Sequence, residues 1–469
     1  MIKYHVYFLL IFTLLLNGVA QNRIGTGNVK KLYTQHCMAC HGQDLNGGLG
    51  GSLLDKDSWK IVGKEQTFME YVQGGNVESG MPAFEKLLTA PQIRSLEILI
   101  DEERQKANAA PPVADEEGVY SAGGYKFRLE TMVDDLDIPW SMAFLPRGGY
   151  LIAERPGPVR IFRDGVLRPP VEGTPKVWAN GQGGMMEVAL HPDYKENGWV
   201  YLAYSAAVDV KGKKRGMTKI VRGRIIDNMW HDEELIFEAP ETTFLPTRLH
   251  FGTRIVFKDG YLFFAIGDRG RQQDAQDLTL PNGKIHRIHD DGRLPKDNPF
   301  VDSDGAFPSL WTYGNRNPQG LDLHPLTGEI WESEHGPRGG DEINLIERGK
   351  NYGWPVITYG MNYSGTPITE KTEMEGMEQP KLYWTPSIAV CGIDFYEGDV
   401  FPKWKYDLFA GGLASREVHR LQVEDGKVVD SEVILKGAGR VRDIASGSDG
   451  HLYLVLNGPD RIVRLVPVE

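Results

Sequence analysis

The stretch Asp259-Gly260-Tyr261-Leu262-Phe263-Phe264 joins a tight turn to an apolar strand, and the same combination recurs after residue 125. Similar runs occupy residues 148–154, 197–202, 327–331 and 449–454. Their spacing of about 40 to 80 residues is typical of four-stranded propeller blades with loop insertions of different lengths. With roughly 340 residues available, an all-β six-bladed propeller is the predicted fold. A pair of β-sandwiches is the alternative.

The sequence before this β-rich region is helical in character. Helix-favouring patterns cover residues 27–36, 65–73 and 90–106, and Thr89 with Gln92 forms a capping-box signature before the last of them. Residues 107–124 contain two prolines and several acidic residues but no apolar period, which is typical of a linker. We therefore expect a small all-α domain over 21–106, a linker over 107–124 and the β-domain over 125–469.

Residues 1–20 have the pattern of a secretory signal peptide. An apolar run over 6–16 follows Lys3, and small residues lead up to a cleavage site after Ala20. A membrane anchor is the alternative, although the run is shorter than the ~20 residues of a spanning helix. Both interpretations predict export, to the periplasm or its equivalent.

Composition limits the class of partner. The 41% hydrophobic and 25% charged content is that of a soluble globular protein, and the net charge of −12 argues against nucleic acid. A neutral or cationic substrate fits better. Two of the three cysteines share one motif, so no disulfide framework is expected. Cys391 lies beside apolar residues, which favours a buried structural thiol over a reactive one.

The motif Cys37-Met38-Ala39-Cys40-His41 predicts covalent haem c. Two thiols at this spacing can add to the haem vinyl groups while the adjacent His41 imidazole binds the iron. A zinc site would need two further ligands that the local sequence lacks.

A sixth iron ligand is expected downstream in a loop, and Met81 lies in the glycine- and proline-rich segment 79–84. Met69 is the competing residue, but its helical pattern favours a role in core packing. A thioether ligand raises the haem potential and makes the haem a good electron acceptor. Residues 27–106 resemble a small class I cytochrome c domain.

The β-domain carries no Gly-x-Gly-x-x-Gly segment between a strand and a helix, so a nicotinamide or flavin Rossmann site is unsupported. Polar clusters instead occupy loops at 313–320, 333–342 and 439–443. Several arginines meeting at one end of a propeller would suit a polyanionic ligand. Taken singly, each arginine is more often a surface ion-pair residue.

From about Leu136 to its C-terminus the chain resembles the soluble quinoprotein glucose and aldose sugar dehydrogenases of the glucose/sorbosone dehydrogenase family. Those proteins are six-bladed propellers that bind pyrroloquinoline quinone (PQQ) and calcium. The segments that carry the resemblance are 180–184, 191–194, 266–270, 291–299, 314–320, 341–346 and 351–355. Their number and shared order make family membership specific without fixing the substrate.

The resemblance implies roles for individual residues. His250 falls at the position of the catalytic base, which takes the proton of the sugar's anomeric hydroxyl while hydride moves to the quinone. Without the resemblance, a core histidine would be the favoured interpretation. The positions that contact the cofactor or line its site are Gln182, Arg316, Asn317, Asp341, Arg440 and Arg442. The carbonyls of Gly336 and Pro337 match the calcium ligands.

Three positions depart from the family pattern. Leu413-Ala414-Ser415 stands where a lysine usually contacts the cofactor, so one cation is missing unless Arg416 replaces it. Leu249 replaces an acid before the base, and His335 replaces a glutamine before Gly336. These changes leave the identity of the sugar open.

The predicted function is that of an exported, PQQ- and calcium-dependent dehydrogenase that oxidises an aldose to its lactone. Its electrons would pass to the haem of the same chain and then to a cytochrome or a quinone-linked oxidase. One alternative is a calcium-dependent lactonase in which His250 activates water, although the haem would then serve no purpose. The other is a non-catalytic carbohydrate-binding or electron-relay propeller.

Overall fold

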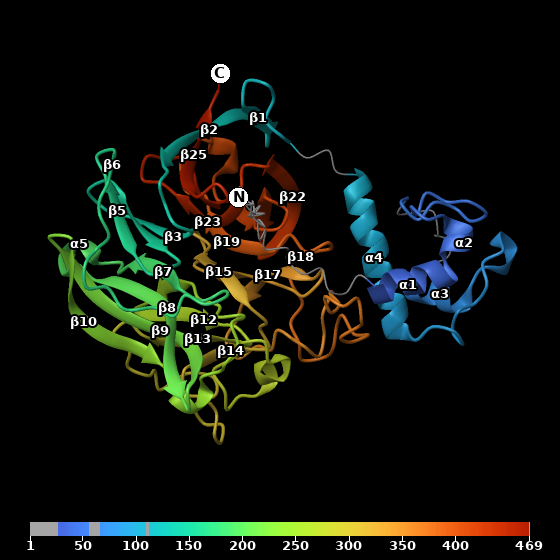
Figure 1. Ribbon diagram of the computed structural model, residues 1–469, viewed down its shortest axis with the longest axis horizontal. Coiled ribbons are helices and arrows are strands. Elements are labelled where there is room, and N and C mark those ends of the chain that lie inside the picture. Colours follow the sequence, from blue (N-terminus) through green and yellow to red (C-terminus); the bar gives the residue numbers. More distant parts are fainter. Residues whose placement is uncertain (1–26, 56–65, 109–111, 469) are drawn as a thin grey trace, which may run out of the picture.

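The computed structural model describes residues 27–55, 66–108 and 112–468 (Figure 1). The predicted signal peptide lies outside this part of the chain. Among the described residues, no helix is both long enough and apolar enough to cross a membrane.

Helices form the N-terminal domain, which lies to one side of the larger β-domain (Figure 1). Its helices are α1 (Gly27–His36), α2 (Met38–His41), α3 (Phe68–Gly74), the 3₁₀ turn η1 (Val77–Ser79) and α4 (Ala90–Asn108). The backbone N–H and the hydroxyl of Thr89 both donate to Gln92 Oε1, at 2.9 and 3.1 Å, at the predicted start of α4. Val29, Ile93 and Leu96 lie in the core of this domain.

The β-domain is a six-bladed propeller, as predicted, with one antiparallel sheet per blade. The first blade contains β3 (Pro139–Phe144), β4 (Tyr150–Glu154), β5 (Val159–Arg163) and β6 (Val166–Leu167). The second contains β7 (Met185–Leu190), β8 (Val200–Val210), β9 (Lys213–Ile226) and β10 (Met229–Glu238), with the short helix α5 (Tyr194–Asn197). The third contains β11 (Ile255–Lys258), β12 (Tyr261–Ile266), β13 (Lys284–His289) and β14 (Leu310–Tyr313).

The last three blades complete the ring. The fourth contains β15 (Pro318–Leu323), β16 (Ile330–Glu334), β17 (Asp341–Ile346) and β18 (Leu382–Trp384). The fifth contains β19 (Val390–Phe395), β20 (Leu408–Gly412), β21 (Glu417–Glu424) and β22 (Lys427–Lys436). The sixth joins β23 (Arg440–Ser446), β24 (Leu452–Asn457) and β25 (Arg461–Pro467) to β2 (Tyr125–Val133) and β1 (Val119–Ala122). The start and end of the propeller sequence thus share one sheet, and this pairing closes the ring.

The structure departs from the predicted boundaries at the linker. Helix α4 continues to Asn108, and β1 lies inside the segment predicted to be a linker. Strand β1 pairs with β2 across Gly123 and Gly124, which both have positive φ values and allow the tight turn. Residues 119–122 are too few to show an apolar period. They form a strand because they pair with β2.

Arg254, just before β11 of the third blade, contacts residues of the second, fourth and sixth blades. Its Nε donates to the Gln319 carbonyl at 2.8 Å, and Nη1 binds Glu187 at 2.8 Å. Nη2 donates to the Arg442 carbonyl at 2.9 Å and lies 3.2 Å from Asp443. Burial raises the pKa of Glu187 to about 8 despite the guanidinium beside it. The central channel therefore contains a buried, charged junction.

We expect Arg254→Met to destabilise the propeller by about 3–5 kcal/mol, because it removes the buried partner of Glu187 and Asp443 and leaves their polar groups buried without a hydrogen bond or a counter-charge. The measurement is the free energy of urea unfolding. Arg224→Met is the matched control, since Arg224 pairs with Asp232 at the surface and its loss should cost about 0–1 kcal/mol. Equal losses in the two variants would show that the junction is not a stabilising element.

Candidate active site and haem site

His250 lies in the loop before β11, with a positive φ of 50°. Its backbone N–H donates to Gln182 Oε1 at 2.7 Å, which places the two predicted site residues side by side. Arg269 fixes the same loop: it donates to the Leu249 carbonyl, and its guanidinium lies 3.3 Å from the centroid of the Phe251 ring. The left-handed conformation of His250 is therefore held by contacts on both sides of it.

Asp268 orients the His250 imidazole. Its Oδ1 lies 2.6 Å from His250 Nδ1, and its Oδ2 accepts a 2.9 Å hydrogen bond from Trp354 Nε1. The N–H of Gly270 donates to the same carboxylate at 2.7 Å. Burial raises the pKa of Asp268, but the hydrogen bond and charge of His250 outweigh it and leave the pKa below its usual range.

These contacts set the protonation of His250. Burial, followed by the charge of Arg316, lowers the pKa of His250 below its usual value, while Asp268 acts in the opposite direction. With Asp268 ionised, the proton of the neutral imidazole belongs on Nδ1. His250 Nε2 has no hydrogen bond to any described residue, so its lone pair is available to accept a proton.

Cationic side chains gather beside this pair. Arg316 Nη1 donates to the carbonyls of His335 and Gly336, at 2.8 and 2.7 Å, while its buried Nε has no partner. Arg442 lies 3.7 Å from the Trp140 ring centroid, and burial lowers its pKa to about 10. Burial and the charges of Arg316 and Arg442 depress the pKa of His335 well below its usual value.

This cluster has the character of an anion site. In the described part of the chain, none of Arg316, Arg440 and Arg442 forms an ion pair with a carboxylate. Buried cations that depress one another's pKa are stabilised when an anion joins them. Arg416 lies close enough to Arg440 to lower its pKa as well, whereas Ala414 is an exposed side chain at the rim. A ligand with several carboxylates, such as PQQ, fits this charge distribution.

Asn317 and Asp341 hold the loops around the site through hydrogen bonds to the backbone. Asn317 Oδ1 accepts the Gly252 N–H at 3.2 Å, two residues after His250. Asp341 accepts hydrogen bonds from the Gly336 N–H at 2.9 Å, the Ser387 hydroxyl at 2.6 Å and the Val390 N–H at 3.0 Å. Burial raises the pKa of Asp341 to about 6. Both side chains therefore hold loops in place through their hydrogen bonds.

The predicted calcium ligands lie on the loop that Asp341 supports. The Gly336 carbonyl faces Arg316, and a Cβ at Gly336 would lie 2.0 Å from the Gly340 carbonyl oxygen, so only glycine fits there. No group of three or more His, Cys, Asp or Glu side chains among the described residues could hold a metal ion. Calcium takes about 6–8 oxygen ligands, so the two carbonyls would supply part of the set and a bound ligand or water the rest.

The haem motif begins a short helix. Cys37 precedes α2, Cys40 is exposed, and His41 Nδ1 lies 2.8 Å from the Gly51 carbonyl. A Cβ at Gly50 would lie 2.9 Å from the His41 ring, so the glycine-rich loop packs directly against the imidazole. This hydrogen bond fixes the ring and leaves Nε2 free to bind iron.

Both candidate methionines pack against the core of this domain. Met81 exchanges two backbone hydrogen bonds of 2.9 Å with Asn76, and these close the loop that carries it. Met69 lies within α3, beside Phe68. The assignment of Met81 as the iron ligand remains a prediction.

We expect Met81→Ala to lower the haem reduction potential and to remove the absorption of methionine-ligated ferric haem, because the thioether stabilises the ferrous iron. Met69→Leu keeps the core filled and is the control, with potential and spectrum unchanged. The measurement is a redox titration of the holo-protein. If Met69→Leu instead lost the methionine signature, the ligand assignment would be reversed.

The sequence indicated several of these residues but not how they pair. It singled out His250 without its partner Asp268, although Ile266-Gly267-Asp268-Arg269-Gly270 had been recognised as a family segment. A carboxylate between two glycines at the end of the buried strand β12 was the available signal. Arg254 and Trp354 carried no such signal, since their partners belong to other blades.

A CxxCH motif and a His250–Asp268 pair beside a cluster of arginines occur in one chain, a combination that suits a haem-linked oxidoreductase. Residues 136–464, more than half of the chain, match the family described as Glucose / Sorbosone dehydrogenase. The chain belongs to this family, and the predicted enzyme class of sugar dehydrogenase is confirmed. Residues 26–96 match the family Cytochrome C oxidase, cbb3-type, subunit III, which confirms a cytochrome c domain.

Individual relatives agree with this assignment. The chain is 43% identical over 333 residues to the aldose sugar dehydrogenase YliI of Escherichia coli (strain K12), covering 70% of this chain and 89% of that protein. The apo-form crystal structure of the Escherichia coli soluble aldose sugar dehydrogenase matches with a TM-score of 0.69 at 40% identity, over 73% of this chain and 100% of that one. The PQQ-bound aldose sugar dehydrogenase of Streptomyces coelicolor matches with a TM-score of 0.60 at 26% identity, over 74% and 100%.

Proposed function

We propose that this protein is an exported quinohaemoprotein that oxidises an aldose to its lactone and passes the electrons to its own haem. The observation that carries the proposal is the His250–Asp268 pair beside three arginines that lack anionic partners. The pair supplies a base, and the arginines supply a place for a polycarboxylate cofactor. The PQQ-bound relative from Streptomyces coelicolor supports the choice of cofactor.

His250 would begin the reaction by accepting a proton. Its free Nε2 takes the proton of the anomeric hydroxyl, and the hydrogen on the same carbon leaves as hydride. The sugar thereby loses two electrons and two hydrogen nuclei and becomes a lactone. Asp268 holds the imidazole in the required tautomer and stabilises the imidazolium that forms.

The cofactors would supply the remaining chemistry. PQQ, when bound, would supply the hydride acceptor, and calcium held by the Gly336 and Pro337 carbonyls would supply a Lewis acid beside it. Arg316, Arg440 and Arg442 would bind the carboxylates of the cofactor, with Arg416 near the place of the missing lysine. Leu249, 46% exposed, places an apolar side chain next to the base.

The haem completes the proposed electron path. Haem iron takes one electron at a time, so each sugar requires two transfers to the haem. A haem held by Cys37, Cys40 and His41 would therefore have to pass each electron to an outside acceptor before it could receive the next. A cytochrome or a quinone-linked oxidase in the periplasm would serve as that acceptor.

The test is haem reduction in the purified holo-cytochrome, followed at the α-band of ferrous haem. PQQ, Ca²⁺ and a panel of aldoses are added together and then with each one left out. Reduction that requires all three additions supports the proposal and ranks the sugars. Absence of PQQ binding would overturn it, and lactone hydrolysis without haem reduction would favour a hydrolase.

A further inference from the structure

One face of α4 joins the haem domain to the propeller. Arg94, Ile98 and Glu102 are spaced four residues apart and therefore share that face. Glu102 forms a bidentate ion pair with Arg338, with distances of 2.9 Å to Nε and 2.5 Å to Nη2. The two side chains are only 8% and 14% exposed, so the pair is largely enclosed by the two domains.

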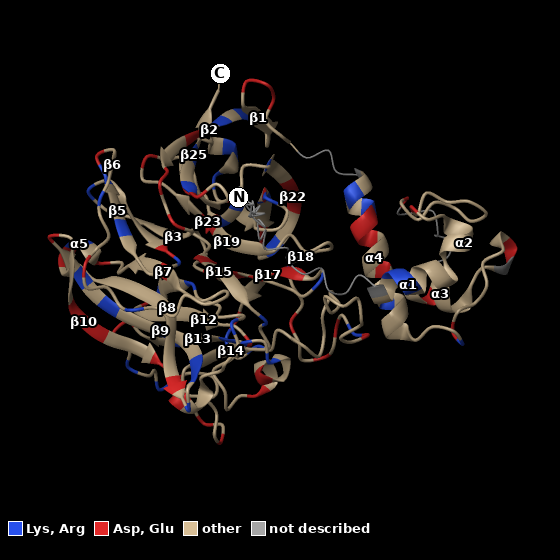
Figure 2. Ribbon diagram, viewed as in Figure 1, with Lys and Arg blue, Asp and Glu red and all other residues tan. Residues whose placement is uncertain are grey.

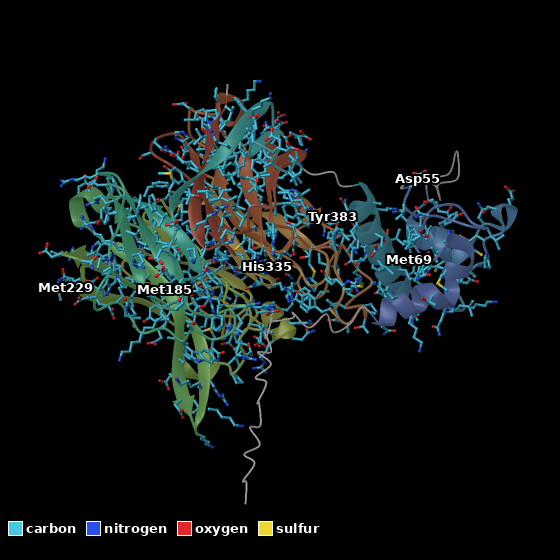
Figure 3. All side chains as sticks on the ribbon, turned by 45° about the horizontal axis from the view of Figure 1, so that its top comes forward. Asp55, Met69, Met185, Met229, His335 and Tyr383 are labelled. Carbon is cyan, nitrogen blue, oxygen red and sulfur yellow. The ribbon has the colours of Figure 1, made fainter. Side chains whose placement is uncertain are left out.

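Aromatic and apolar contacts surround this ion pair. The Arg94 guanidinium lies 5.9 Å from the Tyr359 ring centroid, and that ring stacks on Tyr383 at 3.8 Å. Met361, paired with the Arg338 backbone, is 1% exposed and belongs to the hydrophobic core of the haem domain. Figure 3 shows Tyr383 at the edge of the propeller that faces the haem domain. The contact between α4 and the propeller is therefore closely packed, and the ion pair and the stacked rings fix the relative position of the two domains.

The haem-attachment helix α2 lies away from this contact. In Figure 1, α4 lies next to the propeller and α2 lies on the far side of the haem domain. Acidic and basic residues follow each other along α4, which carries the charged contacts (Figure 2). Among the described residues, Arg94 and Glu102 of this helix form the side-chain hydrogen bonds to the propeller. A helix about 10 Å thick thus stands between the haem site and the propeller.

We propose that the Glu102–Arg338 pair is a latch and that the haem domain must leave the latched position to collect electrons from the propeller. Electron tunnelling weakens steeply with distance, and in the latched position the attachment helix α2 lies on the side of its domain away from the propeller. Release brings the haem toward the candidate active site, where ferric iron takes one electron and becomes ferrous. The ferrous haem then gives that electron to the acceptor. This inference rests on the proposed function.

A disulfide can hold the latch closed. A Cβ at Gly339 would lie 3.5 Å from Ile98 Cγ2, so Ile98→Cys and Gly339→Cys would place two thiols next to each other across the contact. Oxidation of the double variant should slow haem reduction by sugar about tenfold or more, as expected when a domain motion gates the step. Sugar oxidation with a soluble dye acceptor should stay at the level of the Gly339→Cys control, which carries the same positive-φ substitution.

The outcomes separate the latch from the proposed function. If the disulfide-linked protein reduces its haem as fast as its thiol form, the domain need not move and the inference is overturned. If the wild type shows no sugar-dependent dye reduction, the proposed function fails instead. In that case the latch is tested by a measurement that does not depend on enzyme activity.

That measurement is small-angle scattering of the full-length holo-cytochrome. Glu102→Gln should increase the radius of gyration, because loss of the charge releases the haem domain. Glu103→Gln is the matched control, since Glu103 pairs with the exposed Lys106 on α4 and not with the propeller. A Glu102→Gln protein with the wild-type scattering profile would show that the ion pair does not hold the domains together.

Discussion

His250→Asn is expected to lower sugar-dependent haem reduction by about 10²- to 10⁴-fold, the usual contribution of a positioned general base. Asparagine keeps a polar side chain of similar reach but cannot accept the proton at neutral pH. The loss should lie in kcat and be equal with haem or a dye as the acceptor, because both follow the same proton transfer. The measurement is steady-state kinetics after loading with PQQ and Ca²⁺.

The role of His250 as the base also predicts how the rate depends on pH. Only neutral His250 acts as a base, and its pKa lies below the usual histidine value, so the rate should be flat near neutral pH and fall at acid pH. Asp268 raises the pKa of His250, so Asp268→Asn should move the acid limb to still lower pH. It should also lower the plateau, because the imidazole tautomer is no longer fixed.

Cofactor binding is the control for both variants. Neither side chain is an arginine of the cationic cluster, so PQQ affinity, read from the absorbance of the bound quinone, should remain close to that of the wild type. A His250→Asn enzyme with wild-type kcat would remove His250 from the mechanism. Lost activity together with lost PQQ binding would mean that the loop had collapsed.

Local patterns made the fold predictable. Turn-and-strand runs such as Asp259-Gly260 before β12 recur along the chain and predicted a propeller, and the roughly 340 residues available predicted six blades. The CxxCH motif and the capping signature at Thr89 are equally local, and the structure has helices in both places. Strand β1 escaped prediction because its conformation depends on pairing with β2.

The internal geometry of the site depends on contacts between distant segments. Asp268 meets His250 because β12 returns antiparallel beside β11, and no residue type in either segment specifies this pairing. Arg254 reaches Glu187 and Asp443 only because the ring closes and brings the inner strands together. The ion pair between Glu102 and Arg338 likewise depends on how the two domains dock. Such contacts become visible only in three dimensions.

Replacing both motif cysteines, as Cys37→Ala/Cys40→Ala, is expected to abolish covalent haem attachment, because the two thioether bonds have no other thiols nearby. The protein should show no haem mass or haem stain after denaturation. Burial raises the pKa of Cys37 to about 11, so this thiol is protonated at neutral pH in the protein without haem.

The same variant separates the two halves of the proposed reaction. The base and the cationic cluster lie wholly in the propeller, so sugar oxidation measured with a soluble dye should persist while reduction of an acceptor cytochrome is lost. Met38→Leu, which lies between the two cysteines and keeps both thiols, should retain the haem and both activities. If dye-linked activity disappeared with the haem, the haem domain would have to contribute to the sugar or cofactor site itself. Because α4 contacts the loop that continues from Gly336 and Pro337, the α4–Arg338 contact would be the route for that influence.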